Sequence, residues 1–215
     1  DPFALRRHAL GVLRMLIEKA LPVSLNTLID AAWEAEKAVP GVTDHREELR
    51  QFFQDRLRVM LRDAGYTTLE VDAVLALNPE KLDELPKRLA AVRAFMALPE
   101  AEALTAANKR IGNILKKIEG EVPTVVNEAL LAEDAEKQLF AAINDVEPKA
   151  LQHFAAGEYE QMLATLAVLR GPVDSFFDNV MVNAEDPALR ATRQALLKRL
   201  YDVMNKVAEI ARLAK

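Results

Sequence analysis

Apolar residues recur at steps of three and four along almost the whole chain, and this periodicity constrains the fold more than any other feature. In residues 3–20, for example, Ala9, Leu13 and Leu16 fall on one stripe, which is the spacing of an amphipathic helix that buries one face. No segment alternates with the period of two that marks a strand. Glycine is scarce, with 7 in 215 residues, and aromatic residues make up 6%, which argues against an all-β sandwich or barrel. The sequence therefore predicts an all-α fold, a helical bundle of about ten helices in two packed sub-bundles.

Capping residues predict where several of these helices begin. Asp44 with Glu47, and Thr67 with Glu70, have the spacing of a capping box, in which two side chains satisfy free N–H groups at a helix start. The dipeptide Asn78-Pro79 predicts a break followed by a new helix, with Asn as the cap and Pro in the first turn.

Further helices are predicted in the second half of the chain. We expect one at about residues 124–144 and a separate, shorter one at 148–154. Asp186 and Pro187 predict the start of the last helix, which is expected to run over residues 187–213. Its apolar residues follow steps of four and three, so it should pack along its whole length; they are Leu196, Leu200, Val203, Val207 and Ile210.

The stretch 78–86 is the best candidate for a domain boundary, so we expect one helical region at residues 1–85 and a second at 86–215. Asp1 is not a methionine and no signal segment follows it, which predicts a piece or a processed form of a longer chain. No window holds the roughly 18 uninterrupted apolar residues of a membrane span. A cytoplasmic protein is the default expectation.

The residues of the common catalytic motifs are missing. The chain has no cysteine, which excludes disulfides, thiol catalysis and cysteine-based zinc sites. It contains no P-loop, no dinucleotide-binding glycine pattern and no Gly-x-Ser-x-Gly nucleophile motif. The three histidines, His8, His45 and His153, lack metal-ligand spacing. We therefore predict that this segment is non-catalytic by itself and holds neither a metal nor a cofactor.

Charge is distributed unevenly, although the formal net charge is only −5. Residues 119–160 contain ten acidic and two basic residues, a balance of −8, whereas residues 187–215 contain seven basic and two acidic residues, a balance of +5. A smaller group shares neighbouring positions on one predicted helix; we call Lys109, Arg110, Lys116 and Lys117 the basic cluster. Such a surface favours contacts to RNA phosphates, and an ordinary solvated helix face is the alternative explanation.

Phe176 and Phe177 are adjacent aromatic residues on a predicted helix. Neighbouring helical residues point about 100° apart, so at most one of the two rings lies at the centre of a core. The other ring is then available to stack on an RNA base. Burial of both rings between helices is the alternative that we favour.

Four segments of the chain form a recognisable series. They are Asp1-Pro-Phe-Ala-Leu-Arg-Arg7, Ala107-Asn-Lys-Arg-Ile-Gly-Asn-Ile-Leu115, Leu169-Arg-Gly-Pro-Val-Asp174 with Phe176-Phe-Asp-Asn-Val-Met-Val182, and Arg190 and Arg193 with Leu196-Leu197. In this order they resemble the C-terminal part of the β subunit of the bacterial tetrameric glycyl-tRNA synthetase, including its DALR-like anticodon-binding domain. The resemblance spans nearly the whole chain.

The chain departs from this family's pattern in places. Met181-Val182-Asn183 stands where the family often has Met-Val-Met, and Arg190-Ala-Thr-Arg193 stands where it usually has Arg-x-Asn-Arg. The resemblance therefore carries no base-reading role to Asn183 or Thr192.

The resemblance implies that residues 86–215 are an all-helical anticodon-binding domain and that residues 1–85 link it to the upstream part of the β subunit. The segment would bind glycine tRNA, while the α subunit would use ATP and Mg²⁺ to activate glycine for the ligase as a whole. The protein partners would be the α subunit and the rest of the β subunit, with no DNA and no membrane. The residues expected to contact tRNA are Lys109, Arg110, Asn113, Lys116, Lys117, Arg190 and Arg193.

Two other classes of function compete with this interpretation. One is a helical protein–protein interaction module whose acidic face docks a partner without RNA contact. Salt bridges between the basic cluster and the acids of residues 119–160 would favour that module. The other is a stand-alone helical hydrolase, which would need a metal site or a nucleophile cluster that the sequence does not contain.

Overall fold

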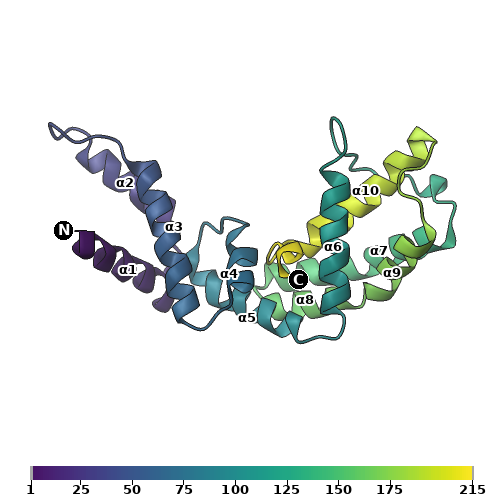
Figure 1. Ribbon diagram of the computed structural model, residues 1–215, viewed down its shortest axis with the longest axis horizontal. Helices are drawn as coiled ribbons and strands as arrows, with labels where there is room; N and C mark the ends of the chain where they lie inside the picture. Colours follow the sequence, from purple (N-terminus) through teal and green to yellow (C-terminus); the bar gives the residue numbers. More distant parts are fainter. Residues whose placement is uncertain (1, 215) are drawn as a thin grey trace. The chain divides into compact units, whose positions relative to one another are not determined.

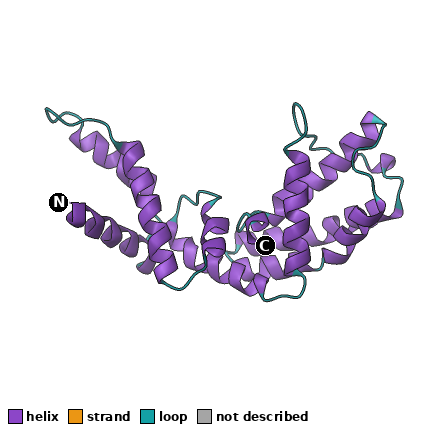
Figure 2. Cartoon of the chain, viewed as in Figure 1, coloured by secondary structure: helices purple, strands orange, loops and turns teal. Residues whose placement is uncertain are grey.

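The computed structural model describes residues 2–214, and in that range the chain consists of helices joined by loops, without a strand (Figures 1 and 2). This confirms the all-α prediction. The chain divides into two compact units, unit 1 (Asp1–Leu89) and unit 2 (Ala90–Lys215), and the division falls inside helix α5 (Leu85–Met96). Within the described range no helix combines the length and the apolarity needed to cross a bilayer.

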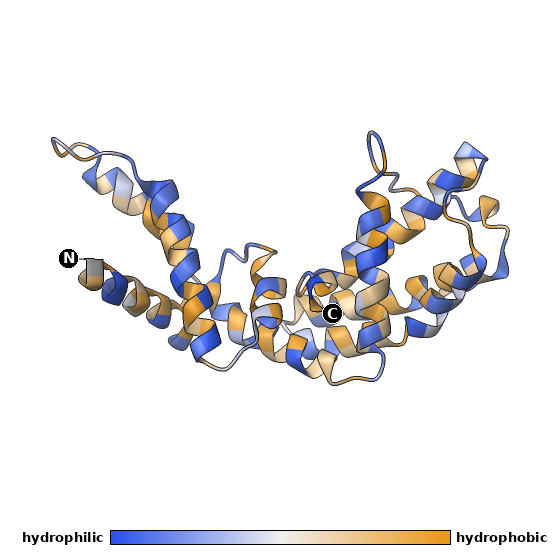
Figure 3. Cartoon of the chain, in the orientation of Figure 1, coloured by the Kyte–Doolittle hydropathy of each residue, from blue (hydrophilic) through white to orange (hydrophobic). Residues whose placement is uncertain are grey.

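Unit 1 is organised around helix α3, which packs against α1, α2 and α4. Its core includes Leu13, Leu57 and Val74, each at most 3% exposed. The helices carry hydrophobic and hydrophilic residues side by side (Figure 3), as expected for amphipathic helices with one buried face. Besides the start of α5, its elements are α1 (Pro2–Glu18), α2 (Leu25–Glu36), α3 (Arg46–Asp63), α4 (Thr68–Leu75) and the short 3₁₀ helix η1 (Leu82–Glu84).

One of the two predicted capping boxes is confirmed. At the start of α4, the backbone N–H of Glu70 donates to the Thr67 hydroxyl at 3.2 Å, and the backbone N–H of Thr67 donates to the Glu70 carboxylate at 2.6 Å. The reciprocal bonds satisfy two N–H groups that a helix start leaves free. This helix start could therefore be predicted from local sequence alone.

Only half of the capping box predicted at Asp44 and Glu47 is present: the Asp44 carboxylate accepts from the backbone N–H of Arg46 at 3.1 Å, whereas Glu47 pairs with Arg50. Helix α3 begins at Arg46, and the residue before it makes no side-chain cap. The Nε of Arg46 donates to Asp44 at 3.0 Å, and its guanidinium also reaches Asp30 of α2 at 3.0 Å. The Arg46 hydrogen bonds hold the pKa of the Asp44 carboxyl at about 2, below its usual 3.8.

The helix start predicted at Asn78-Pro79 is wrong. Asn78 has a φ of +46°, a left-handed conformation that asparagine tolerates better than most residues. Its N–H donates to the carbonyl of Leu75 at 3.0 Å, so Asn78 closes the end of α4. The next helical turn begins only at Leu82.

Unit 2 contains the larger core. Helix α7 packs against α8, α9 and α10, and α6 packs against α9, α10 and the last short helix. Leu139, Ile143, Met162 and Phe176 are all 0% exposed. Besides the remainder of α5, its elements are α6 (Ala101–Leu115), η2 (Glu128–Leu130), α7 (Asp134–Ala155), α8 (Tyr159–Ala167), α9 (Arg170–Asn179), α10 (Pro187–Met204) and η3 (Ile210–Leu213).

The separate helices predicted at 124–144 and 148–154 are in fact one helix that starts later. Helix α7 begins at Asp134, after a capping box formed by Glu133 and Glu136. It continues through Pro148, which lies inside the helix. A proline removes one backbone hydrogen bond and strains the turn before it, but packing of α7 on three other helices outweighs this local penalty.

The last long helix begins as predicted and ends earlier than predicted. Its start is confirmed, because the Asp186 carboxylate accepts from the N–H of Ala188 at 2.8 Å. It ends at Met204, where the amide side chain of Asn205 donates to Tyr201 O at 2.7 Å and accepts from the N–H of Ile210 at 3.0 Å. The predicted apolar seam is nevertheless buried throughout, since all five of its residues are at most 2% exposed.

Candidate nucleic-acid interface

Helix α6 has one face in the core of unit 2 and one face in solvent. Leu104 and Ile111 are at most 1% exposed, while the basic cluster is exposed. Gly112 lies where α6 meets α10, because a Cβ at this position would stand 3.2 Å from Cε2 of Tyr201. The absence of a side chain therefore lets the two helices approach closely, which fixes the position of the exposed face.

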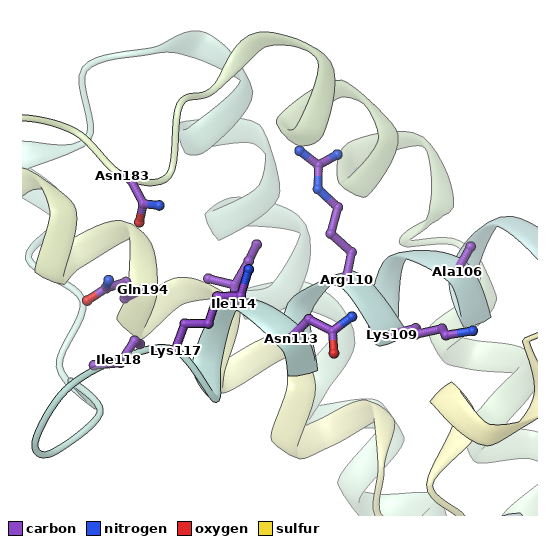
Figure 4. Close-up of a pocket in the computed structure, with 9 residues that line it drawn as sticks. All are labelled: Ala106, Lys109, Arg110, Asn113, Ile114, Lys117, Ile118, Asn183 and Gln194. Atoms are coloured by element: carbon purple, nitrogen blue, oxygen red, sulfur yellow. The ribbon is translucent and has the colours of Figure 1, made fainter.

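A groove of about 480 Å³ follows this exposed face. Figure 4 shows that its side chains come from α6 and the turn after it, from the loop between α9 and α10, and from α10 itself. Among residues 2–214, no acidic residue lines it. The lining residues are Ala106, Lys109, Arg110, Asn113, Ile114, Lys117, Ile118, Asn183 and Gln194.

Four of the seven residues predicted to contact tRNA line this groove together. They are Lys109, Arg110, Asn113 and Lys117. Lys116 is exposed just after the end of α6 but lies outside the groove lining. Because no acid shares the lining, the groove has an uncompensated positive charge, which attracts an anionic ligand.

Arg193 occupies a different environment, and its burial does not fit the predicted phosphate contact. It is 5% exposed. Its guanidinium forms an ion pair with Glu136 of α7 and donates to the carbonyl of Met181 at 2.7 Å. This arginine holds α10, α7 and the loop before α10 together, so its role is structural.

Arg190 is half-buried one turn before Arg193 and lies outside the groove lining. One nitrogen of its guanidinium donates to the carbonyl of Ala184 at 3.0 Å. The arginine therefore fixes the loop that carries Asn183 toward the groove. Its contact holds the loop beside the α6 groove, and its charge lies outside the groove lining.

The basic residues of α10 largely neutralise acids within unit 2. The Nε of Arg199 donates to Glu147 of α7 at 2.6 Å, and Lys198 pairs with Asp202. The basic cluster of α6 differs, since none of its four residues forms an ion pair within residues 2–214. The salt bridges to residues 119–160 that would favour a pure protein-interaction module are thus made by α10, not by α6.

Phe176 and Phe177 lie in different environments. Phe176 is 0% exposed, and Phe177 is half-buried and meets it edge to face, with 5.6 Å between ring centroids. The expectation that both rings are buried between helices is therefore confirmed for Phe176, whereas Phe177 is buried only in part. The guanidinium carbon of Arg110 lies 4.1 Å from the centroid of the Phe177 ring, within the range of a cation–π contact.

Sequence reasoning missed the two polar groove residues that lie outside the segment of α6, Asn183 and Gln194. They lie about 70 and 80 positions after α6 and approach it only through the packing of α10 on α6. The departure from the family pattern at Asn183 was the one signal in the sequence that pointed to this position.

The groove can bind an anion and read polar edges, because it offers ammonium, guanidinium and amide groups. It contains no hydroxyl, carboxylate or imidazole that could serve as nucleophile or general base. Across residues 2–214, no three His, Asp or Glu side chains gather as metal ligands would.

Two family models match the chain. The model described as "Glycyl-tRNA synthetase beta subunit" matches residues 1–76, which lie in unit 1. The model described as "DALR anticodon binding domain" matches residues 104–211. The second match includes every residue that lines the groove.

Curated relatives match along the whole chain. The glycine–tRNA ligase β subunit of Leptothrix cholodnii is 61% identical over 214 residues, that of Delftia acidovorans is 56% identical over 214, and that of Thiobacillus denitrificans is 55% identical over 215. Each alignment covers 100% of this chain and 30% of the relative. The chain thus spans less than a third of the length of these relatives.

Proposed function

Because the chain belongs to the family of glycyl-tRNA synthetase β subunits, with a DALR anticodon-binding domain in unit 2, we propose that it is the part of a glycine–tRNA ligase that recognises the tRNA anticodon. The observation that carries the proposal is the α6 groove. It combines basic side chains that lack ion pairs with amide side chains, and it lies within the residues that match the anticodon-binding family. These are the groups that hold RNA phosphates and meet unstacked bases.

A division of labour within the ligase is the second part of the proposal, and it rests on the resemblance to β subunits. The α6 groove offers groups for binding. We propose that ATP, Mg²⁺ and glycine activation belong to the α subunit, and tRNA recognition to this chain. The α subunit, the rest of the β subunit and glycine tRNA are the partners, and the cytoplasm, where tRNA is charged, is the location.

Replacing Lys109 and Lys117 together by alanine is expected to weaken tRNA binding by the assembled synthetase. Each lysine that leaves a phosphate lowers the slope of log affinity against log salt by about 0.7–0.9, so the slope should fall by about 1.4–1.8 for two phosphate contacts. The loss should be similar for every tRNA, since phosphates carry no sequence information. Affinity is measured by fluorescence anisotropy at a series of salt concentrations.

A matched control removes two lysines from the acidic side of unit 2. Lys137 and Lys149 are exposed on α7, so their double alanine variant loses the same charge elsewhere. Its affinity and salt slope should stay at the wild-type values. If the two double variants had equal slopes of log affinity against log salt, the α6 groove would not be part of the tRNA interface. That result would support the rival protein–protein interaction module.

A further inference from the structure

The Phe177 ring supports the Arg110 guanidinium on one side. One side lies over the Phe177 ring, with 4.1 Å from the guanidinium carbon to the ring centroid. The other side belongs to the groove, because Arg110 is exposed and lines it. Figure 4 shows the Arg110 side chain extending from α6. A planar cation with one open face is a surface on which an aromatic ring can stack.

The ring beneath Arg110 is itself fixed. Phe177 meets the fully buried Phe176 edge to face, a favourable arrangement for two aromatic rings. Both residues lie on α9, which packs against α6. The stack of Phe177 and Arg110 is therefore anchored in the core of unit 2 and does not depend on loop residues.

The side-chain amides that line the groove near Arg110 are available to bind a ligand. The side-chain amides of Asn113, Asn183 and Gln194 make no hydrogen bond among residues 2–214, although all three residues line the groove. Some other amides of unit 2 are used internally; for example, Asn179 donates to the Ser175 carbonyl at 2.8 Å. An amide presents a donor and an acceptor together, the combination that meets the edge of a nucleobase.

We propose that the α6 groove holds one unstacked base of the anticodon loop against the open face of Arg110, so that base, guanidinium and Phe177 form three successive layers. The inference rests on the proposed function and adds a base-stacking site to it. Single-stranded RNA loops are recognised by stacking on aromatic rings and on arginine planes. Lys109 and Lys117 hold the neighbouring phosphates, and the three amides face the base edge.

The substitution Arg110→Lys separates stacking from charge. Lysine keeps the positive charge and loses the plane, so a phosphate contact would survive and a stack would not. Loss of one stacked base corresponds to about a 5- to 150-fold drop in affinity. We expect Arg110→Lys to weaken tRNA binding by at least about fivefold, close to the effect of Arg110→Ala. Arg170→Lys, at an exposed arginine of α9 that pairs with Asp174, is the matched control and should bind as wild type.

An abasic scan of the anticodon loop then identifies the stacked base. The assembled synthetase is titrated with tRNAs that each lack one loop base. At one position, removal of the base should weaken wild-type binding and make wild type and Arg110→Lys equal, because the stack is already lost. Phe177→Leu should also reduce the difference in tRNA affinity between proteins with Arg110 and those with the Arg110→Lys substitution, because it removes the aromatic ring that supports the guanidinium.

Two results would overturn the stacking site while leaving tRNA binding intact. One is an Arg110→Lys variant within twofold of wild type when the Lys109 and Lys117 variant is weakened. The other is an abasic scan in which the effect of Arg110→Lys is the same at every position. Failure of the proposed function looks different, because neither the lysine nor the arginine variants would then change tRNA affinity.

Discussion

Replacing Glu136 by leucine is expected to lower the free energy of unfolding by about 3–5 kcal/mol, because it leaves the buried Arg193 without its partner. Glu136 is 0% exposed, and the two side chains are ion-paired across α7 and α10. The second carboxylate oxygen of Glu136 accepts from the N–H groups of Ala132 and Glu133, both at 2.8 Å. The substitution therefore leaves the buried Arg193 cation without its counter-ion. It also removes the acceptor of the N–H groups of Ala132 and Glu133 at the start of α7. Urea unfolding followed by circular dichroism measures the loss.

A double variant distinguishes a stranded charge from general loss of packing. Glu136→Leu with Arg193→Leu removes both charges and should be more stable than Glu136→Leu alone. The exposed pair of Lys149 and Asp145 on α7 provides the control, and Lys149→Ala should change stability by less than about 1 kcal/mol. A Glu136→Leu variant that is destabilised no more than Lys149→Ala would contradict the structural role given to this pair.

Replacing Phe176 by alanine is expected to cost about 3–5 kcal/mol of stability, since the ring is fully buried and its removal leaves a cavity. Phe177→Ala should cost clearly less, because that ring is only half-buried. The two variants therefore separate the core ring from the groove ring. Thermal and urea unfolding of both proteins provide the comparison.

Binding data complete the test of these neighbouring rings. Phe177→Ala should weaken tRNA binding by a folded protein, because it removes the support of Arg110. If the two alanine variants lost equal stability, the assignment of Phe176 to the core and Phe177 to the groove would be incorrect.

The all-α class could be predicted because each helix carries its own apolar stripe. The boundaries could be predicted only where a local contact decides them, as with Thr67 and Glu70 at α4. At Asp44 the competing partner, Arg46, also makes a contact to a different helix. At Pro148 the deciding factor is packing of α7 on other helices. Neither the contact nor the packing is visible in a local sequence pattern.

The site followed a similar rule. Lys109, Arg110, Asn113 and Lys117 could be predicted because they share one exposed helix face. Arg193 could not be separated from them by charge, since only the fold shows that Glu136 lies beside it. Asn183 and Gln194 reach the groove through tertiary packing. Local periodicity thus finds the basic surface, and long-range contacts decide which of its charges are free.

The most direct test is a photocrosslink between the anticodon loop and the protein. Glycine tRNA with a photoreactive 4-thiouridine at single loop positions is bound to the assembled synthetase, irradiated and digested, and crosslinked peptides are identified by mass spectrometry. We predict crosslinks to residues 106–118, in α6 and the turn after it, and to residues 183–194, which border the groove. Crosslinks confined to unit 1 or to the acidic surface of α7, from a tRNA that is bound and chargeable, would contradict the assignment of this groove to the anticodon.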